Sequence, residues 1–380
     1  MPGYVKAPTV AAGDARGCAR GWDAVAARLL SAGARVIVVE AFPGVRRDDL
    51  LELAGRLRPD FVVETSTLFR PPSEVNALVL PELTHDPVFG RISGLTMRDF
   101  IDPQRLAGLA SSVADARGSV LIMGPGASLV ARGDVLVLAE MPRWETQLRQ
   151  RRGEVDNLGA DNRDQPASML YKRSYFVDWR VCDRLKNEAW HDVDLFLDTT
   201  RAEPRMIARE AIERALSAAA SGPFRVVPYF DPAPWGGQWM RRVCDLDPGP
   251  PNFGWCFDCV PEENSLLLDF GGTTFETPAQ NLVFQRPREL LGDAVTARFG
   301  CEFPIRFDFL DTVGGGNLSL QVNVIGLYVY GLNKSGIGPG RRIINGINWG
   351  IGDVDINQGL VRQTRSRVRD LVSKCSYSVK

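Results

Sequence analysis

Helix-like and strand-like runs alternate over residues 21–230, and this alternation limits the folds open to the chain. Helical periodicity marks Trp22–Ser31 and Arg47–Leu57, and the short apolar runs Arg35–Val39 and Phe61–Val63 have the composition of strands. In βαβ units, parallel strands are joined by helices that cover the sheet. The first part of the chain is therefore predicted to be an α/β domain.

The same pattern continues to the end of this region. The sequence predicts a loop-like, Pro-rich passage followed by further helices and strands. In chain order these are a loop near Arg70–Val88, a helix at Pro103–Ala116, strands at Ser119–Met123 and Asp134–Ala139, a basic helix from Pro142 through Arg152, a strand at Asp192–Asp198, a helix from about Pro204 to Ala220 and a strand at Phe224–Tyr229.

Gly124–Leu129, GPGASL, directly follows a predicted strand, and backbone amides in such a glycine turn can hold phosphate oxygens. A working P-loop needs G-x-x-x-x-G-K-[ST]. GPGASL has neither the lysine nor the length, so the sequence favours a structural turn. The domain is then P-loop-kinase-like without a working P-loop.

A second feature is a basic set at helical spacing, which has two interpretations. It is a solvated helix face with salt bridges, or a surface that binds an anionic sugar phosphate or the neighbouring domain. The set comprises Arg143, Trp144, Glu145, Arg149, Arg151 and Arg152, continued by Lys172 and Arg173.

Beyond Phe230 helical signals nearly vanish and short β-type runs are separated by Pro and Gly, which predicts a domain boundary near residues 222–232. Within Phe303–Asn323, FPIRFDFLDTVGGGNLSLQVN, two alternating runs flank a glycine turn. Ser319, Gln321 and Asn323 alternate with apolar residues and are expected to share one face of a strand.

This stretch resembles the motif of type I phosphomannose isomerases, L-P-x-L-F-K-x-L followed after a short gap by L-S-x-Q-x-H-P. Residues from about Gly124 through PYFDPAPWGGQWM and WCFDCVPEENSLLL also resemble bacterial class I mannose-6-phosphate isomerases that carry an α/β domain before a cupin barrel. The resemblance implies an α/β domain over residues 1–225, an incomplete cupin-like β-barrel domain over 226–322 and a divergent basic tail over 323–380.

The resemblance also implies zinc-dependent interconversion of mannose 6-phosphate and fructose 6-phosphate. By position Gln321 matches a zinc ligand, whereas Asn323 stands where the family has His, and Asp308 stands where it has Lys. Arg306 is a candidate for holding the substrate phosphate. A Gln–Asn pair is a poor zinc site, so the expected activity is impaired.

Two alternatives stay open. The chain is a non-enzymatic protein that binds sugar phosphates or other partners on the same fold, or residues 323–380 are the product of a shifted reading frame or splice choice. That tail is rich in Lys and Arg and contains no Glu. Its end, Leu360–Lys374, has the pattern of an amphipathic packing helix.

Composition restricts partners and compartment. Of 380 residues 44% are hydrophobic and 24% charged, with a net charge of −1, so neither nucleic acid nor a membrane is predicted as a partner. The seven cysteines are scattered, and the N-terminus has no long apolar segment of a signal peptide. These features predict reduced thiols and a cytoplasmic protein.

The remaining candidates for chemistry have structural interpretations. Cys256 and Cys259 form a C-x-x-C without a second pair, which favours buried thiols over a metal or redox site. His85 and His191 lie far from the zinc motif, and His191 is expected at a helix-to-strand boundary. The carboxylates near the motif, Asp258, Glu262, Glu263, Asp308 and Asp311, are assigned to salt bridges, with an acid/base role as the alternative.

Overall fold

A computed structural model describes residues 9–85, 90–91, 93–221 and 265–286. The chain divides into two compact units. One contains Thr9–Ala219 and Ser265–Pro278 and is an α/β unit. The other contains Met1–Pro8, Ala220–Asn264 and Ala279–Lys380; its described residues include the helix α13 (Gln280–Gln285).

The α/β unit is built on a seven-stranded sheet with the order β2-β8-β7-β6-β3-β5-β4 among the described residues. The strands are β2 (Cys18–Arg20), β3 (Val36–Ala41), β4 (Phe61–Glu64), β5 (Val120–Gly124), β6 (Val135–Glu140), β7 (Leu195–Asp198) and β8 (Arg205–Ala208).

Strands β3 to β7 are parallel, and β8 runs antiparallel to β7 and β2. All residues of β3, β5 and β6 are buried. Strands that are covered on both faces need apolar residues at nearly every position, which explains the continuous runs VIVV, VLIM and VLVLA. The α/β class predicted from the sequence is confirmed.

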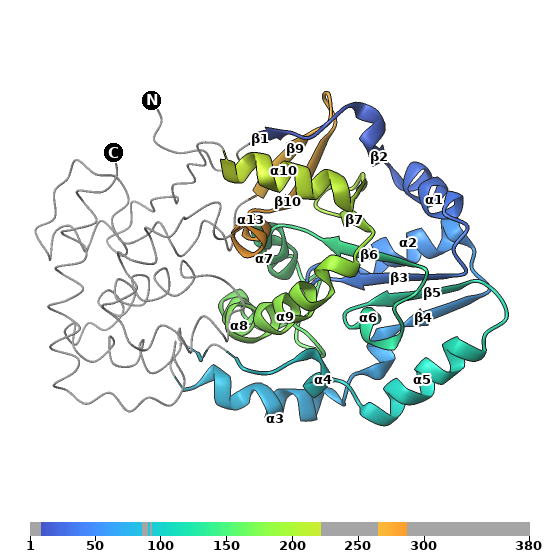
Figure 1. Ribbon diagram of the computed structural model, residues 1–380. Coiled ribbons are helices and arrows are strands. Elements are labelled where there is room, and N and C mark those ends of the chain that lie inside the picture. Colours follow the sequence, from blue (N-terminus) through green and yellow to red (C-terminus); the bar gives the residue numbers. More distant parts are fainter. Residues whose placement is uncertain (1–8, 86–89, 92, 222–264, 287–380) are drawn as a thin grey trace, which may run out of the picture. The chain divides into compact units, whose positions relative to one another are not determined.

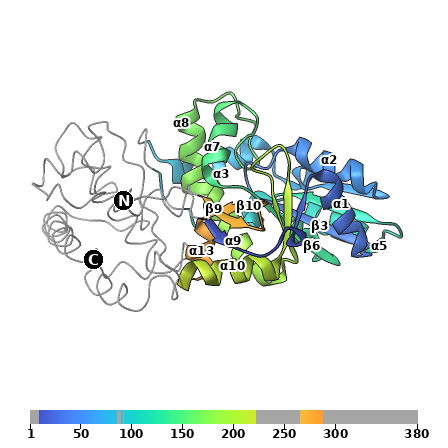
Figure 2. The ribbon, with the colours of Figure 1, turned by 90° about the horizontal axis from the view of Figure 1, so that it is seen from above.

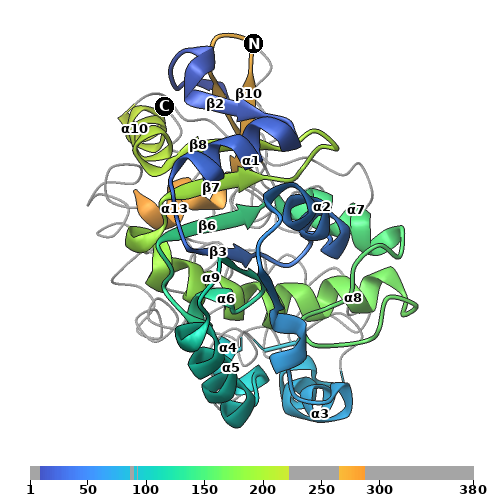
Figure 3. The same cartoon turned by 90° about the vertical axis from the view of Figure 1, so that its right-hand side faces the viewer.

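Helices α1 and α2 cover one face of the sheet, and α6 and α9 cover the other (Figures 1 and 3). Helices α7 and α8 lie side by side (Figure 2). The helices are α1 (Trp22–Ser31), α2 (Arg47–Leu57), α3 (Pro72–Leu83), α4 (Met97–Phe100), α5 (Pro103–Asp115), α6 (Ala127–Val130), α7 (Arg143–Arg151), α8 (Ala167–Arg173), α9 (Trp179–Ala189) and α10 (Arg209–Ser221). Single turns of 3-10 helix lie at Ala15–Gly17, Thr65–Leu68 and Trp190–Asp192, and a π-helical turn, Ser174–Asp178, joins α8 to α9.

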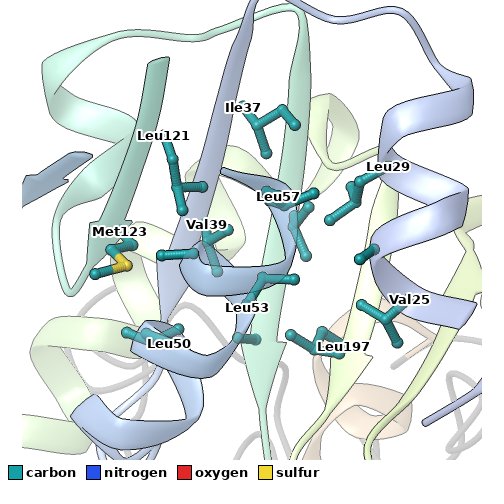
Figure 4. Packing of buried hydrophobic residues seen from close by; sticks show 14 of the residues in the cluster. Val25, Leu29, Ile37, Val39, Leu50, Leu53, Leu57, Leu121, Met123 and Leu197 are labelled. Carbon is teal, nitrogen blue, oxygen red and sulfur yellow. The ribbon is translucent and has the colours of Figure 1, made fainter. Parts of the chain in front are cut away.

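The core on the α1–α2 face is apolar (Figure 4). Val25 and Leu29 of α1 project onto the sheet with Leu53 of α2, and they meet side chains of β3, β5 and β7. In α2 the buried positions Leu50, Leu53 and Leu57 recur at intervals of three and four residues, as a helix buried on one side requires. The opposite face is different, because it carries the polar groups described below.

A smaller three-stranded sheet completes the unit. β1 (Thr9–Ala11) pairs in parallel with β9 (Ser265–Asp269), which forms an antiparallel hairpin with β10 (Thr274–Pro278) (Figure 1). The apolar end of PEENSLLL forms β9. Strands from the predicted β-domain region thus lie in the same compact unit as the α/β sheet.

Local periodicity located most elements, and the limits predicted for α1 and α2 are those of the structure. Two predictions were wrong. The passage near Arg70–Val88 contains α3, since Pro72 stands in its first turn and Pro81 is accommodated within it, while Val75 and Val79 are buried. The predicted helix at Pro204–Ala220 begins only at Arg209, because Arg205–Ala208 pairs as β8.

Other predictions fall outside the described residues: the strand Phe224–Tyr229, the cupin-like barrel and the helix Leu360–Lys374. In the part of the chain that the structure describes, no helix is both long and apolar enough to cross a membrane.

Candidate functional site

Three acidic side chains stand at the carboxyl ends of central strands. Glu40 of β3, Glu140 of β6 and Asp198 of β7 are 5%, 0% and 1% exposed. Glu140 is paired with Asp198, and Glu40 is paired with Leu138, two residues before Glu140. Because alternate strand residues share a face, all three carboxylates lie on one side of the sheet.

Their place in the topology is distinctive. After β3 the chain continues to β4 on one side of the sheet, whereas after β6 it continues to β7 on the other. In open α/β sheets, ligands bind outside the carboxyl ends of strands at such a reversal. Glu40, Glu140 and Asp198 are called the carboxyl-edge cluster below.

Glu40 is bound to the GPGASL loop. Its Oε1 accepts a hydrogen bond from the amide of Gly126 at 2.7 Å, and its Oε2 accepts bonds from the amide and hydroxyl of Ser128 at 2.8 and 2.7 Å. Burial raises the pKa of Glu40 to about 7, although these three donors oppose the shift. The loop considered as a phosphate site therefore already holds a carboxyl group from its own chain.

The turn between β3 and α2 is fixed by two side chains of α7. Thr146 donates a hydrogen bond from its hydroxyl to the carbonyl of Pro43 at 3.2 Å, and Arg149 donates from its guanidinium to the carbonyl of Gly44 at 2.9 Å. Arg149 is 2% exposed and also binds Glu145 at 3.0 Å. The turn thus presents carbonyl acceptors to α7.

The start of α2 is occupied by internal ion pairs. Arg46 lies 2.8 Å from Asp49, and Arg47 forms two hydrogen bonds with Glu64 at 2.6 and 2.7 Å. Asp48 and Asp49 place negative charge in the first turn of the helix. Acidic residues stabilise this end of a helix, because its free N–H groups carry partial positive charge.

Buried charges of alternating sign extend from Glu140 into α9 and α7. Lys186 lies 3.4 Å from Glu140 and 3.9 Å from Asp183, and Asp183 lies 2.5 Å from Arg143. Burial lowers the pKa of Arg143 to about 10, so its guanidinium remains positive at neutral pH. The guanidinium also stacks on Trp179, 4.6 Å from the ring centroid.

Asp198 and Glu140 are contacted by the β9–β10 hairpin. Asp198 accepts a hydrogen bond from the amide of Glu276 at 3.0 Å, and Glu140 accepts one from the hydroxyl of Thr277 at 3.0 Å. Asp198 also accepts a bond from the amide of Thr200 at 2.8 Å. Burial raises the pKa of Asp198 to about 6.

A protein-family model described as "Domain of unknown function (DUF8485)" matches residues 21–221, more than half of the 380 residues. The chain belongs to this family. Comparison of the sequence with the curated proteins gave no match. The DUF8485 match contains the whole carboxyl-edge cluster, but it does not include β1, β2 or the β9–β10 hairpin.

Most of the basic set predicted from the sequence is buried in the interior of the DUF8485 domain. Arg143 and Arg149 are buried and paired with carboxylates. Arg152 is paired with Glu145 and Glu154, but its side chain is 45% exposed. The salt bridges of the first interpretation are therefore present, but the face is not solvated at Arg143 or Arg149. Apolar packing and ion pairing, rather than hydration, hold these long side chains.

Its continuation in α8 is also buried. Lys172 is 3% and Arg173 is 4% exposed, and Arg173 donates hydrogen bonds to Asn76 at 2.6 Å and to the carbonyl of Leu158 at 2.8 Å. The π-helical turn that follows carries Asp178, 3.5 Å from Arg173. This part of the set therefore supports the interior of the domain.

The other candidates are placed as follows. His191 lies in the 3-10 turn between α9 and β7, which confirms the predicted boundary position. Cys18 and Cys182 are free and buried. The phosphate candidate Arg306, the zinc candidates Gln321 and Asn323, the pair Cys256 and Cys259, and the carboxylates Asp258, Glu262, Glu263, Asp308 and Asp311 lie outside the described residues. Over the described ranges, no three or more His, Cys, Asp or Glu residues are grouped to hold a metal ion.

The carboxyl-edge cluster itself was not predicted from the sequence. Its signal is present: each of the runs VIVVE, VLVLAE and LFLD ends in an acidic residue after apolar ones. In a parallel sheet such residues all reach the same edge, where function is concentrated.

Proposed function

We propose that the DUF8485 domain of this chain is a P-loop-kinase-like domain that does not transfer phosphoryl groups. A P-loop joins a strand to the next helix and has the form G-x-x-x-x-G-K-[ST]. Residues 41–48 have this position, between β3 and α2, and read AFPGVRRD. All four specified positions differ, at Ala41, Arg46, Arg47 and Asp48.

The observation that carries this proposal is the bonding of the turn to α7. A phosphate site needs backbone N–H groups that converge on the anion. Here the carbonyls of Pro43 and Gly44 accept hydrogen bonds from Thr146 and Arg149 instead. The side chains of α7 complete the turn without a ligand.

Electrostatics support the same conclusion. Arg46 is paired with Asp49, Arg47 with Glu64, and Arg149 with Glu145. A triphosphate would have to separate these pairs and approach Asp48 and Asp49, whose charges repel it. The domain is therefore proposed to act as a binding or scaffolding module.

Nucleotide binding tests this proposal. The full chain should show no saturable binding of ATP with Mg²⁺ up to millimolar concentrations, measured by calorimetry. The variant A41G/R46G/R47K/D48T restores G-x-x-x-x-G-K-T and should gain weak binding. Micromolar binding or ATP hydrolysis by the unchanged chain would refute the proposal.

For residues 226–322 we propose the function that the resemblance implies, mannose-6-phosphate isomerisation, in an impaired form. The resemblance in LSLQVN supports it through Gln321. The donor set does not fit zinc, because the neutral amides of Gln321 and Asn323 replace the imidazole and carboxylate ligands that zinc favours. Turnover is therefore expected to be weak or absent.

Three measurements on the purified full chain separate this proposal from its alternative. Elemental analysis should find far less than one zinc per chain, and isomerase turnover should stay near background after zinc is added. Saturable binding of mannose 6-phosphate without turnover would favour a non-enzymatic sugar-phosphate-binding protein. Robust zinc-dependent turnover would contradict the impaired site.

A further inference from the structure

The outer edge of β4 carries exposed apolar side chains. β4 ends the seven-stranded sheet beside β5, and no strand of the described residues pairs with its other edge (Figure 1). Phe61 is 51% and Val62 is 46% exposed, whereas every residue of the inner strands β3, β5 and β6 is buried. An edge strand that presents free backbone groups and apolar side chains is a template for pairing with another strand.

The backbone groups of β4 point alternately toward β5 and away from it. The Phe61 amide donates a hydrogen bond to the carbonyl of Ser119 at 3.0 Å, at the start of the β4–β5 pairing. Because this direction alternates along a strand, Phe61 and Val63 turn their N–H and C=O groups to β5, and Val62 and Glu64 turn theirs outward. The Glu64 carbonyl also accepts a hydrogen bond from the Thr67 hydroxyl at 2.9 Å, but a carbonyl has a second lone pair for a partner strand.

A second copy of β4 can pair with this edge about a two-fold axis in two registers. Antiparallel pairing joins outward-facing residues, so Val62 lies opposite either Val62 or Glu64 of the second copy. The first register also sets Asp60 opposite Glu64, and these like charges repel each other. The second register joins Val62 to Glu64 in both directions and sets Val63 opposite Val63. Charge therefore selects the second register.

The second register also suits the side chains around the edge. Glu64 is already paired with Arg47, so each copy brings a neutral ion pair rather than a bare carboxylate. Phe61 and Val63 share the other side of the strand, where Phe61 becomes a diagonal neighbour of Val63 of the second copy. The pairing thus covers Phe61 and Val62 and satisfies the outward backbone groups.

We propose that β4 is a dimerisation edge, at which two copies of this chain join their seven-stranded sheets by antiparallel pairing of Val62 with Glu64. The partner is a second copy because the edge is complementary to itself in backbone direction, charge and apolar contact. β4 has only four residues, so the interface is small and micromolar association is expected. The dimer does not depend on whether the domain binds nucleotide.

Sedimentation equilibrium of the purified full chain tests the dimer through an exchange of charge at one position. Val62→Glu sets a glutamate opposite each Glu64, whereas Val62→Lys sets a lysine there. The dissociation constant of Val62→Glu should exceed that of Val62→Lys by about 10-fold, the combined effect of two cross-strand charge pairs. Leu80→Glu changes a residue of α3 that is 64% exposed and should leave the dissociation constant of the unchanged chain.

Disulfide cross-linking tests the register and also serves if Val62→Glu fails to fold. Val63 of the two copies would form a non-hydrogen-bonded pair with Cα atoms about 4.5 Å apart, a separation that a disulfide spans. Under mild oxidation Val63→Cys should link two chains through residue 63, located by mass spectrometry of peptides, and Leu80→Cys should not link through residue 80. A chain that stays monomeric up to about 1 mM would overturn the proposal. Equal dissociation constants for the two Val62 variants, or no linkage at residue 63, would do the same.

Discussion

Glu140 and Asp198 stand directly opposite each other at the ends of the adjacent parallel strands β6 and β7, and both are buried. Two carboxylates in this relation repel each other unless donors compensate. Lys186 forms an ion pair with Glu140, and Thr277 donates a hydrogen bond to it. The amides of Thr200 and Glu276 donate hydrogen bonds to Asp198. The stability of this edge therefore depends on groups from three distant segments of the chain.

The buried pair of Glu140 and Lys186 should be sensitive to loss of its cation. Lys186→Met leaves a buried carboxylate without this partner, which costs about 3–5 kcal/mol of unfolding free energy. Arg132→Met removes an exposed pair with Asp192, where the two side chains are 78% and 50% exposed, and should cost about 0–1 kcal/mol. Urea denaturation of both variants measures the difference. Equal costs would show that Lys186 does not compensate Glu140.

Glu40 should give stability a measurable dependence on pH. Its pKa is 4.5 in the unfolded chain and about 7 in the folded protein, so the folded protein binds the proton more tightly. The contribution of Glu40 to stability is therefore most favourable below pH 4.5, falls as the pH rises and is about 3 kcal/mol lower above pH 7.

Glu40→Gln removes this titration, so the fall in unfolding free energy between pH 5 and 8 should become shallower. Asp198, whose pKa is raised to about 6, should leave a smaller slope of the same sign. Denaturant melts across this pH range measure the slope. Glu52→Gln, on the exposed face of α2, controls for the loss of a carboxylate. An unchanged slope in Glu40→Gln would contradict the prediction.

Gly44 should resist substitution for two reasons. Its φ is +105°, and an added Cβ would lie 2.4 Å from the Thr146 hydroxyl. Gly33 has φ +64° with open space around it, so Gly33→Ala tests backbone strain alone and should cost about 1 kcal/mol. Gly44→Ala should cost more, by about 1–3 kcal/mol, because Thr146 must shift. Thermal melts of the two variants measure these losses of stability. Equal losses would show that Thr146 moves aside at little cost.

A fragment of the chain should be stable only when it includes the β9–β10 hairpin. A fragment of residues 1–225, the α/β domain predicted from the sequence, lacks β9 and β10 and would expose Glu140, Asp198 and Trp144. It should melt at a lower temperature and aggregate more readily than a fragment of residues 1–286, since β1 also loses its partner strand. Calorimetry and size-exclusion chromatography compare the two. Equal stability would mean that the hairpin contributes little to the unit.

Several features of the site were within reach of the sequence. The loop 124–129 was correctly placed after a buried strand, and the helix of the basic set was found, since both depend on local patterns. The burial of Arg143 and Arg149 was not predicted. From sequence alone a charged residue is predicted to be exposed. Burial follows only when its ion-pair partners, here Asp183 and Glu145, are known to lie beside it.

The sequence by itself determined the α/β class and the limits of α1 and α2, because apolar periodicity and local backbone preference act over a few residues. Tertiary structure decided that Arg205–Ala208 is a strand, since four residues become one only by pairing with β7 and β2. It also decided that Glu40 binds the loop around Gly126, that Asp198 stands beside Glu140, and that Thr277 donates a hydrogen bond to Glu140. These contacts join residues tens to more than a hundred positions apart. Strand order brings the first two together, whereas Thr277 reaches Glu140 from a separate sheet.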